Sequence, residues 1–480
     1  MLNISNRREC FFNDRLINTF RTTAEPLMHH PIRKDTVMKH DEPWEGNGCN
    51  YHNFFCDDGI YRMYYLAWTF EKPETAKVCY AESNDGIHWV KPKLGICEWD
   101  GNRENNIIMD SRTLNSTVDN FMVFKDTNPL CEAEKRYKAV CRAEVNGAPM
   151  LYCYYSSDAI HFERGNLITD NGAFDTLNVA FYDEVAKIYR CYFRGWHIPG
   201  NFDEFASNQG NEEEFLRDIR YIESADFVNW TKPRLINLGN SEDVALYTNL
   251  IQPYCRAKHI LIGFPTRYIY RREWTDNYER LCGKEARRKR METLPRFGLA
   301  VTDCAFIVSD DGRNFKKYDE AFIRPEPECG TNWIYGDCYP ARGLIETPSD
   351  IKGADAELSM YMPDEHTWSA ESVNLVRYTI RSDGFVSMHA GEKEKTVVTK
   401  PFIFDGDKLY VNFATSALGY MYFTVVDEDG NKYESCEIFG NKTDRIIDFK
   451  EGVLKNLSGK PVTLEVRMRD ADLYSIKFDF

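Results

Sequence analysis

The sequence predicts an all-β protein, a five-bladed β-propeller followed by a C-terminal antiparallel β-sandwich. Three observations support this fold class. Short segments rich in aromatic and β-branched residues alternate with turns along most of the 480 residues. A motif of the form Ser-x-Asp-x-x-x-aromatic closes one group of these segments after another. After about residue 395 the pattern changes to short strands joined by tight turns, which is typical of a small sandwich.

The repeated motif sets the number of blades. It begins at Ser83, Ser156, Ser224 and Ser309, and a shorter fifth copy begins at Ser382. Each copy follows three or four expected strands, and the first four copies lie 73, 68 and 85 residues apart. Units of this length are typical of propeller blades, whereas solenoid repeats have about 20–45 residues. We interpret the aspartates of the motif as turn residues; they are Asp85, Asp158, Asp226, Asp311 and Asp383.

These patterns divide the chain into three parts. Residues 1–40 show no clear period and are expected to form an arm on the main domain, residues 41–394 the propeller, and residues 395–480 the sandwich. Extra length at 271–296 in the fourth blade is interpreted as a solvated insertion, with a lid or an oligomer contact as the alternative. The sandwich is expected to cover one flank of the propeller, with a carbohydrate-binding module as the alternative.

Charge and cysteine content exclude several classes of function. The formal net charge is −15 and the pI about 5.3, whereas surfaces that bind nucleic acid or anionic membranes need a positive field. The start of the chain has no apolar segment, and no apolar run approaches the ~20 residues of a membrane span. Fifteen cysteines without C-x-x-C spacing predict reduced thiols, no structural zinc and a cytoplasmic protein. A small carbohydrate is the expected partner, and a homo-oligomer is left open.

The first residues of the innermost strand of each blade are expected to point into a pocket at one end of the channel. Carboxylates, arginines and aromatic residues gather at these positions. Glycosidic cleavage needs one carboxylic acid that protonates the leaving oxygen and a second carboxylate that attacks the anomeric carbon or activates water. Neighbouring carboxylates raise one another's pKa, which keeps the acid protonated near neutral pH.

Three acids are predicted to be catalytic. Asp175 follows a turn suited to aim it inward, with a strand-end cap or hydroxyl binder as the alternative. Asp218 follows Arg217 directly and precedes Arg220, a pattern that fits a structural salt bridge equally well. Glu242 lies in a polar loop before an inner strand, where a solvated role is the alternative.

A second set, drawn from all five blades, is predicted to hold the sugar. No cofactor is expected, because the sequence has neither a Gly-rich phosphate loop nor a G-x-S-x-G elbow. His52, His197 and His366 lack ligand-type spacing, so no metal site is predicted. The predicted sugar-binding residues are Glu45, Asp119, Arg194, Arg217, Tyr247, Asn249, Asp303, Trp333 and Asp337.

The blade repeat, with Val78–Trp89 as one copy, resembles the five-bladed propellers of glycoside hydrolase families 32 and 43. The runs Pro43-Trp-Glu45, Phe174-Asp175 and Arg217-Asp218-Ile-Arg220 are similar to bacterial proteins described as glycosyl hydrolase family 32 N-terminal-domain-like. This resemblance covers most of the chain. It implies a propeller with a C-terminal sandwich and a hydrolase that acts on a furanoside or small oligosaccharide.

The chain departs from the family 32 motifs at the residues that carry the chemistry. The family's nucleophile motif, Trp-x-Asn-Asp-Pro-Asn, is replaced in the first blade by a run, residues 47–53, that contains no Asp. The family's Arg-Asp-Pro is echoed by Arg217-Asp218-Ile219, but in the third blade, and its Glu-Cys motif has no clear match. A non-catalytic carbohydrate-binding propeller is therefore the alternative function.

Overall fold

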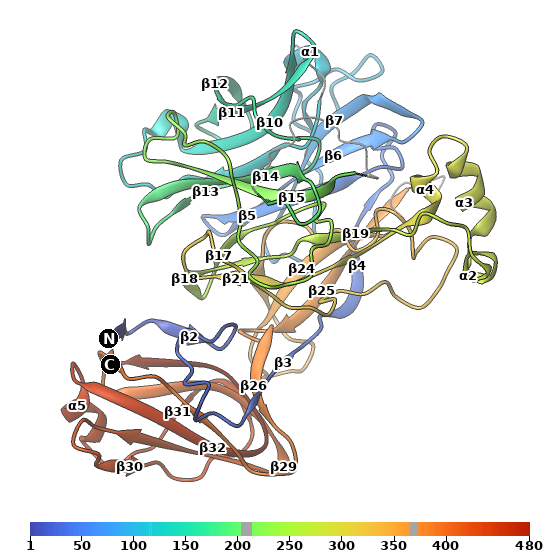
Figure 1. Cartoon of the computed structure of the whole chain (residues 1–480). Helices are drawn as coiled ribbons and strands as arrows, with labels where there is room; N and C mark the ends of the chain where they lie inside the picture. The colour runs from blue at the N-terminus through green and yellow to red at the C-terminus, as the bar shows by residue number, and fades with distance from the viewer. Residues whose placement is uncertain (115, 117, 203–213, 365–371) are drawn as a thin grey trace.

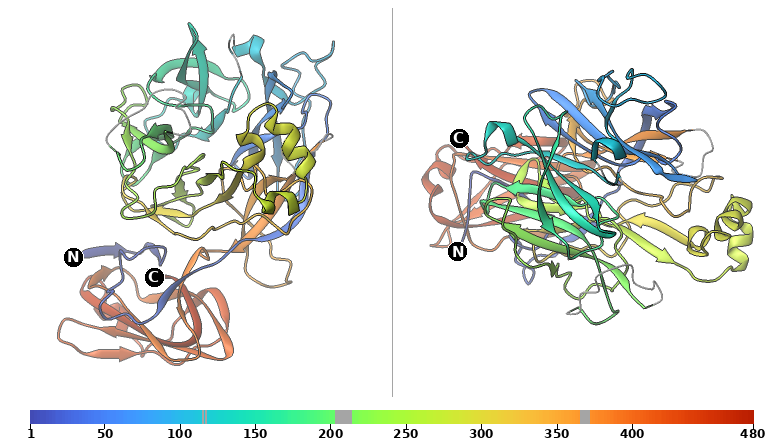
Figure 2. Two further views of the ribbon diagram at one scale, coloured as in Figure 1. Left: turned by 45° about the vertical axis from the view of Figure 1, so that its right-hand side comes forward. Right: turned by 90° about the horizontal axis from the view of Figure 1, so that it is seen from above.

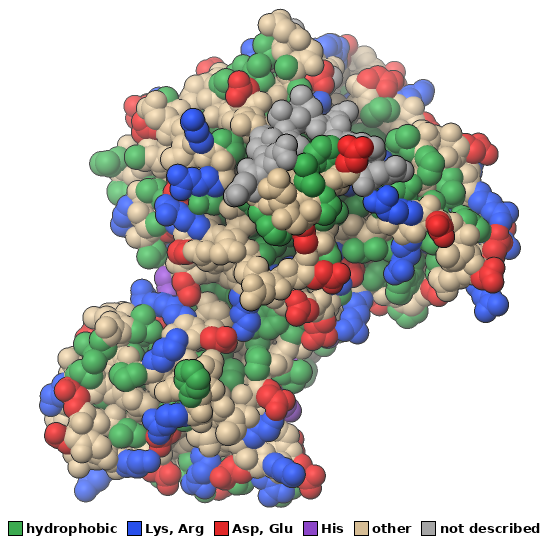
Figure 3. Space-filling model, viewed as in Figure 1, with side chains coloured by type: hydrophobic (Ala, Val, Ile, Leu, Met, Phe, Trp, Pro, Cys, Tyr) green, Lys and Arg blue, Asp and Glu red, His purple; other side chains and the backbone are tan. Residues whose placement is uncertain are grey.

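The computed structural model describes residues 1–114, 116, 118–202, 214–364 and 372–480. Five four-stranded antiparallel sheets are arranged in a ring, and a separate β-domain lies to one side of it (Figures 1 and 2). Figure 3 shows the two parts as lobes joined by a narrower region. The predicted five-bladed propeller and C-terminal β-sandwich are confirmed.

Each blade pairs its strands in a simple antiparallel order. Blade 1 is β5 (Asn50–Asp57), β6 (Ile60–Thr69), β7 (Lys72–Ser83) and β8 (Ile107–Met109). Blade 2 is β9 (Met122–Lys125), β10 (Tyr137–Val145), β11 (Ala148–Ser156) and β12 (Glu163–Thr169). Blade 3 is β13 (Val179–Asp183), β14 (Ile188–His197), β15 (Leu216–Ser224) and β16 (Arg234–Leu235).

The last two blades depart from this simple order along the chain. Blade 4 is β17 (Gln252–Tyr254), β18 (Ala257–Gly263), β21 (Ile307–Ser309) and β22 (Lys316–Lys317). Its second and third strands are separated by the pair β19 (Thr266–Tyr270) and β20 (Ala300–Cys304), with α2 (Asp276–Arg280), α3 (Lys284–Met291) and α4 (Arg296–Leu299) between them. Blade 5 is β23 (Ile345–Thr347), β24 (Glu357–Asp364), β25 (Val373–Arg381) and the N-terminal strand β4 (Ile32–His40).

Both faces of a blade are covered by its neighbours, and the strand sequences reflect this. In β14, nine of the ten residues are buried. Its polar side chains are not confined to one face of the strand. Two-sided burial removes the alternation that a half-exposed strand would show. Many of the aromatic side chains therefore pack between neighbouring blades.

The C-terminal domain forms around the two longest strands. These are β29 (Lys408–Val426) and β32 (Pro461–Asp479), which pair antiparallel with an irregularity between Thr415 and Tyr420. The sheet curls over a core of its own, separate from the cores of the propeller. The other elements are β26 (Val386–Ala390), β27 (Lys395–Val398), β28 (Phe402–Phe404), β30 (Lys432–Glu434), β31 (Asn441–Ile446) and α5 (Val453–Leu457).

The first forty residues are shared between the two parts. Strands β1 (Leu2–Ser5), β2 (Arg8–Cys10) and β3 (Glu25–Met28) join the C-terminal sheet, and β4 then completes blade 5. At the crossing, Phe11 belongs to the core of the C-terminal domain and Phe12 to that of the propeller, where its ring lies 5.4 Å from Tyr254 and from Phe385. Two adjacent rings therefore anchor one segment in both domains.

The first four copies of the repeated motif form the expected turns. In the first copy, Ser83 Oγ accepts the Gly86 N–H at 2.9 Å, and Asp85 Oδ1 accepts the N–H groups of Ile87 and His88 at 2.8 Å. The same bonds recur in the copies that begin at Ser156, Ser224 and Ser309. The interpretation of these aspartates as turn residues is confirmed.

Asp383 also lies in a turn, as expected, but its side chain makes different contacts from those of the other four aspartates. Its carboxylate is fully buried between the domains and accepts bonds from Arg8 at 3.2 Å and Arg256 at 2.9 Å. The hydroxyls of Tyr254 and Ser475 donate to it at 2.7 Å each. Because the C-terminal domain follows this turn directly, the aspartate is enclosed there rather than exposed to solvent. Burial raises its pKa, but the two arginines outweigh this and lower the pKa of Asp383.

Replacement of Asp383 by alanine should strongly destabilise the fold, because two arginines would remain buried without their shared carboxylate. Loss of one partner of a buried ion pair costs about 3–5 kcal/mol. The midpoint of chemical denaturation should therefore fall clearly in Asp383→Ala. Asp444→Asn is the matched control, because Asp444 contacts the same two arginines but its side chain is 41% exposed. Equal stability of both variants would contradict the role given to Asp383.

Candidate active site

One end of the propeller gathers segments from all five blades. In an antiparallel blade, the turn between the second and third strands lies at the same end as the start of the first strand. At this end the structure has a cavity of about 800 Å³, the channel pocket, within the range of ~300–1,000 Å³ usual for ligand sites. Its lining includes Tyr51, Asp119, Asp175, Tyr247 and Tyr339, one residue from each blade in order.

Aromatic rings form much of the wall of the channel pocket. Trp68 and Phe70 come from the β6–β7 hairpin, and Tyr335 from the segment before the inner strand of blade 5. The Tyr247 and Tyr335 hydroxyls are hydrogen-bonded at 2.9 Å. Partly exposed rings with polar tips suit sugars, which present C–H faces and hydroxyl edges. Tyr51 has a φ of 54°, a left-handed backbone conformation that is uncommon for a bulky residue and is often found at functional sites.

Two carboxylates of the channel pocket have different surroundings. The Asp119 side chain is 15% exposed and accepts a bond from Arg142 at 2.9 Å. Burial outweighs this ion pair and raises the pKa of Asp119. The Asp175 side chain is 43% exposed and forms an ion pair with Arg194, a contact that favours the charged form of a carboxyl group. Arg194 is also among the charges that act on Asp119, so both acids lie near one guanidinium.

Two arginines and Tyr247 lie beside these acids. The guanidinium carbons of Arg194 and Arg217 are 4.9 and 5.2 Å from the centre of the Tyr247 ring. Burial raises the pKa of Tyr247, but these two positive charges outweigh it and lower the pKa of Tyr247. The Nε and Nη1 atoms of Arg194 are buried and have no hydrogen-bond partner among the described residues.

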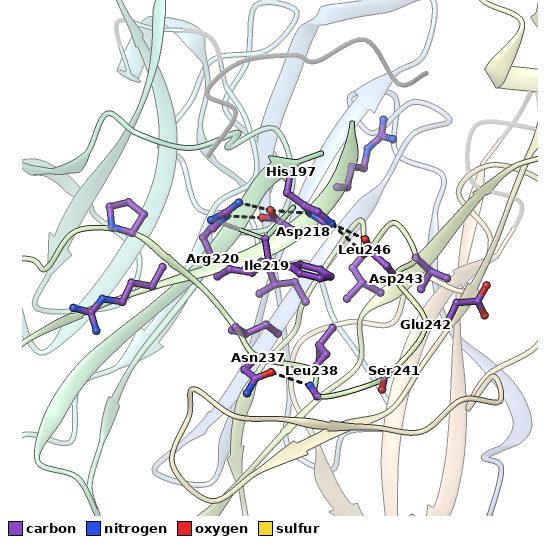
Figure 4. A pocket seen from close by; sticks show the side chains of 18 residues that line it. His197, Asp218, Ile219, Arg220, Asn237, Leu238, Ser241, Glu242, Asp243 and Leu246 are labelled. Carbon is purple, nitrogen blue, oxygen red and sulfur yellow. Dashed lines mark hydrogen bonds and ion pairs between the residues drawn. The ribbon is translucent and has the colours of Figure 1, made fainter. Parts of the chain in front are cut away.

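A second pocket of about 470 Å³ lies between blades 3 and 4 (Figure 4). In it, His197 Nδ1 lies 3.2 Å from Asp218 and Nε2 lies 3.0 Å from Asp243. Arg220 donates two bonds to Asp218, at 2.6 and 2.9 Å. Glu242 is exposed, and Figure 4 shows its carboxylate pointing away from His197 and Asp218.

The three predicted catalytic acids are therefore divided between two pockets. Asp175 lines the channel pocket, and Asp218 and Glu242 line the second pocket. Arg217 lines the second pocket as well, while its guanidinium stacks on Trp196 at 4.6 Å and over Tyr247. Of the predicted sugar-binding residues, Asp119 and Tyr247 line the channel pocket. Arg194 forms an ion pair with Asp175, which lines the pocket.

The remaining predicted sugar-binding residues serve internal contacts. Glu45 is fully buried, and although burial raises its pKa, His40 and Lys91 lower the pKa of Glu45 to about 2. Asp303 forms a two-bond ion pair with Arg267 at 2.6 Å. The others are Asn249, which donates to the Tyr192 carbonyl and accepts the Ile251 N–H; Trp333, whose indole donates to the Glu326 carbonyl; and Asp337, which accepts the Trp333 N–H and whose pKa burial raises to about 7.

One group of potential metal ligands occurs among the described residues, formed by His40, Glu45 and Cys49. The Lys91 ammonium donates to Glu45 at 2.7 Å and would compete with a cation there. His52 stacks on Tyr65 and contacts His40 at 3.0 Å in the same buried cluster. His366, the third histidine considered from the sequence, lies outside the described residues.

The pocket residues that the sequence reasoning missed come mainly from one kind of position. Trp68, Phe70 and Arg142 lie at or beside the turns between second and third strands. The sequence prediction covers mainly the starts of the inner strands. The alternating direction of antiparallel strands was the available signal, since it brings those turns to the same end.

No family model matches the chain, and no curated protein matches it. Solved structures resemble it only distantly. An N-acetylgalactosamine deacetylase from F. plautii in complex with blood group B trisaccharide has a TM-score of 0.45 and 12% identity over 75% of this chain and 95% of that one. A glycosyl hydrolase from Bacteroides ovatus has a TM-score of 0.41 and 12% identity over 73% and 94%. A fructofuranosidase from Schwanniomyces occidentalis complexed with fructosylnystose has a TM-score of 0.36 and 10% identity over 96% and 98%.

The resemblance to family 32 seen in the sequence motifs is therefore not accompanied by a matching family model. The five-bladed propeller that this resemblance implied is present. Among the described residues, no helix is both long and apolar enough to cross a bilayer.

His197 should titrate at a higher pH than an ordinary histidine. Burial lowers its pKa, but bonds to Asp218 and Asp243 outweigh this and raise the pKa of His197 above 6.5. Its stabilising contribution is therefore complete below the unfolded pKa and is lost as pH rises through the folded pKa. In an NMR titration of the imidazole, Asp243→Asn should lower this pKa and Glu242→Gln should leave it unchanged. An unchanged pKa in Asp243→Asn would contradict the ion pair.

Proposed function

We propose that the protein is a glycoside hydrolase that cleaves a furanoside or small oligosaccharide in the channel pocket. The observation that carries this proposal is the presence of two carboxyl groups, Asp119 and Asp175, on the wall of one aromatic-lined cavity and in contrasting surroundings. Glycosidic cleavage uses such a pair, one protonated and one ionised. The size of the pocket and its aromatic wall support a sugar as the ligand.

In this proposal Asp119 is the general acid. Its burial raises its pKa and so favours the protonated form, which can donate a proton to the departing glycosidic oxygen. Arg142 donates to one of its oxygens at 2.9 Å, and the backbone N–H of Asn120 donates to the other at 2.8 Å. The neighbouring Glu144, which also pairs with Arg142 at 2.7 Å, limits the stabilisation that Arg142 gives to the charged form of Asp119.

Asp175 then acts as the nucleophile or as the base that activates water. It is more exposed than Asp119 and is held by Arg194 on the inner side of the pocket. Asp218 and Glu242 have no catalytic role in this proposal, because Asp218 is already bound by Arg220 and His197 and Glu242 points away.

The alternative is a carbohydrate-binding propeller without turnover. The ion pair between Asp175 and Arg194 favours it, because an acid held in this way is also suited to accept bonds from sugar hydroxyls. The absence of the family 32 nucleophile motif in the first blade points in the same direction. Binding of oligosaccharides without release of any reducing sugar would support this alternative.

Asp175→Asn should abolish turnover of aryl furanosides and pyranosides while leaving the fold intact. The amide is nearly isosteric but cannot attack the anomeric carbon or accept a proton from water, so a loss of about 10²–10⁴-fold or more in kcat is expected. Circular dichroism and the denaturation midpoint would report the fold. Undiminished turnover in Asp175→Asn would show that this acid is not catalytic.

Asp119→Asn should show a loss that depends on the leaving group. A general acid matters most when the leaving oxygen is basic, so turnover should fall steeply for an alkyl or sugar leaving group and little for dinitrophenyl. In the wild type, kcat/KM should fall as the pH rises and the general acid loses its proton. This fall should be absent in Asp119→Asn. An equal loss with both leaving groups would assign Asp119 to binding instead.

A further inference from the structure

The outer face of the C-terminal sandwich carries a group of three aromatic side chains. In the second half of β29, Met421 is buried in the core, and Tyr420 and Tyr422 on either side of it point outward and are half-buried. The antiparallel bridge between Met421 and Ile438 places Phe439 opposite Tyr420 on the same face. Phe439 is 64% exposed. Tyr420, Tyr422 and Phe439 together are called the aromatic patch.

The two tyrosine rings of the aromatic patch are held by carboxylates. The Tyr420 hydroxyl donates to Glu394 at 2.6 Å, and the Tyr422 hydroxyl donates to Glu437. The centres of the two rings are 5.7 Å apart, and the rings meet edge to face at 68°. Rings that are already fixed lose less conformational freedom when a ligand binds. The patch is therefore organised before a ligand arrives.

Charged side chains of both signs surround the aromatic patch. Arg469 and Arg467 lie opposite Tyr420 and Tyr422 on the neighbouring strand β32. The guanidinium carbon of Arg467 is 4.4 Å from the centre of the Tyr422 ring, and Arg467 also pairs with Glu394 at 3.4 Å. Opposite charges that alternate in this way produce no strong field of one sign. The face is thus suited to a neutral ligand.

The mixture of rings and charges matches a carbohydrate better than a protein partner. The centre of a protein–protein interface is depleted of charged residues, whereas on this face ionic groups lie directly beside the rings. A sugar unit presents an apolar C–H face that packs on an aromatic ring. Its hydroxyl groups form charge-assisted hydrogen bonds with carboxylate and guanidinium groups. A neutral oligosaccharide therefore uses both features of the face.

We propose that the aromatic patch is a second carbohydrate-binding site, which takes a neutral oligosaccharide or polysaccharide chain. The C–H faces of the sugar units pack on Tyr420, Tyr422 and Phe439, and their hydroxyl groups bond the charged side chains beside these rings. The site lies on the C-terminal domain and does not include the channel pocket.

The two sites lie at opposite ends of the propeller. Arg256, at the turn between β17 and β18, pairs with Asp444 of the C-terminal domain, and this turn lies at the end of the blade remote from the channel pocket. A ligand of a few sugar units reaches only one site. A long chain bound at the aromatic patch stays near the protein and raises its own concentration at the channel pocket. This last role rests on the proposed function, whereas binding at the patch does not.

The test is affinity electrophoresis of the full-length Asp175→Asn variant, in native gels that each contain one neutral polysaccharide. The probes are a levan, an arabinan, a β-mannan and a xylan. At least one of them should slow the variant relative to a gel without polysaccharide. The dependence of mobility on polysaccharide concentration gives the dissociation constant for the preferred probe.

Removal of two rings should weaken this binding. Tyr420→Ala/Phe439→Ala, made in the same background, should lose about tenfold or more in affinity for the preferred probe. Tyr410→Ala is the matched control, because Tyr410 is another half-buried tyrosine of β29 and pairs with Lys477 in the other half of the strand. Phe70→Ala, which alters the wall of the channel pocket, is the second control. Both controls should bind like the parent, and circular dichroism reports the fold of each variant.

Three results would overturn the proposal. The first is unchanged mobility with all four polysaccharides. The second is an equal loss of affinity in Tyr410→Ala, and the third is a loss in Phe70→Ala with unchanged binding by the double variant, which would place binding in the channel pocket. Turnover of aryl glycosides is measured separately in the wild type. Failure of the aromatic patch and failure of the proposed hydrolase therefore remain distinguishable.

Discussion

Alternation of strand direction within each blade is the constraint on which the candidate site depends. Four antiparallel strands bring two kinds of connection to the pocket end, the one that leads from the fourth strand of a blade to the first strand of the next and the turn between the second and third strands. Asp119, Asp175 and Tyr247 come from the first kind, and Trp68 and Phe70 from the second. The insertion α2–α4 is an enlarged turn of the second kind in blade 4. Length added at such a turn therefore always reaches the pocket end.

Charge inside the ring is balanced pair by pair. Arg194 lies between Asp175 and Tyr247, and Arg142 lies between Asp119 and Glu144. The second pocket repeats this arrangement with His197 between two aspartates. Asp119 and Asp175 both contact an arginine but differ in burial, since the side chain of Asp119 is 15% exposed and that of Asp175 is 43% exposed.

The fold was predictable from the sequence because its signal is periodic. Four turns of the same type, each set by a Ser and an Asp two residues later, reveal the blades without knowledge of any long-range contact. The role of Asp383 was not predictable in this way, because its local sequence matches the turn while its partners Arg8 and Arg256 come from distant segments. The addition of β4 to blade 5 is likewise a long-range pairing without a local signature.

The candidate site was predictable only in part, for related reasons. Asp119, Asp175 and Tyr247 were found because the starts of inner strands can be located from the repeat. Glu45 and Asp303 occupy similar positions, but nearby basic residues hold them in internal ion pairs. Whether an acid meets an arginine or an open cavity depends on side chains from neighbouring blades. That information is absent from the local sequence.

The N-terminal segment makes the two domains inseparable in a practical sense. Strands β1–β3 are hydrogen-bonded into the C-terminal sheet, and the next strand, β4, is the outermost strand of blade 5. A propeller produced without the residues after 394 would carry β1 and β2 without their partners β28 and β32. Unpaired strand edges of this kind promote aggregation. Recombinant fragments that respect the domain boundary in the sequence would thus still cut through a shared sheet.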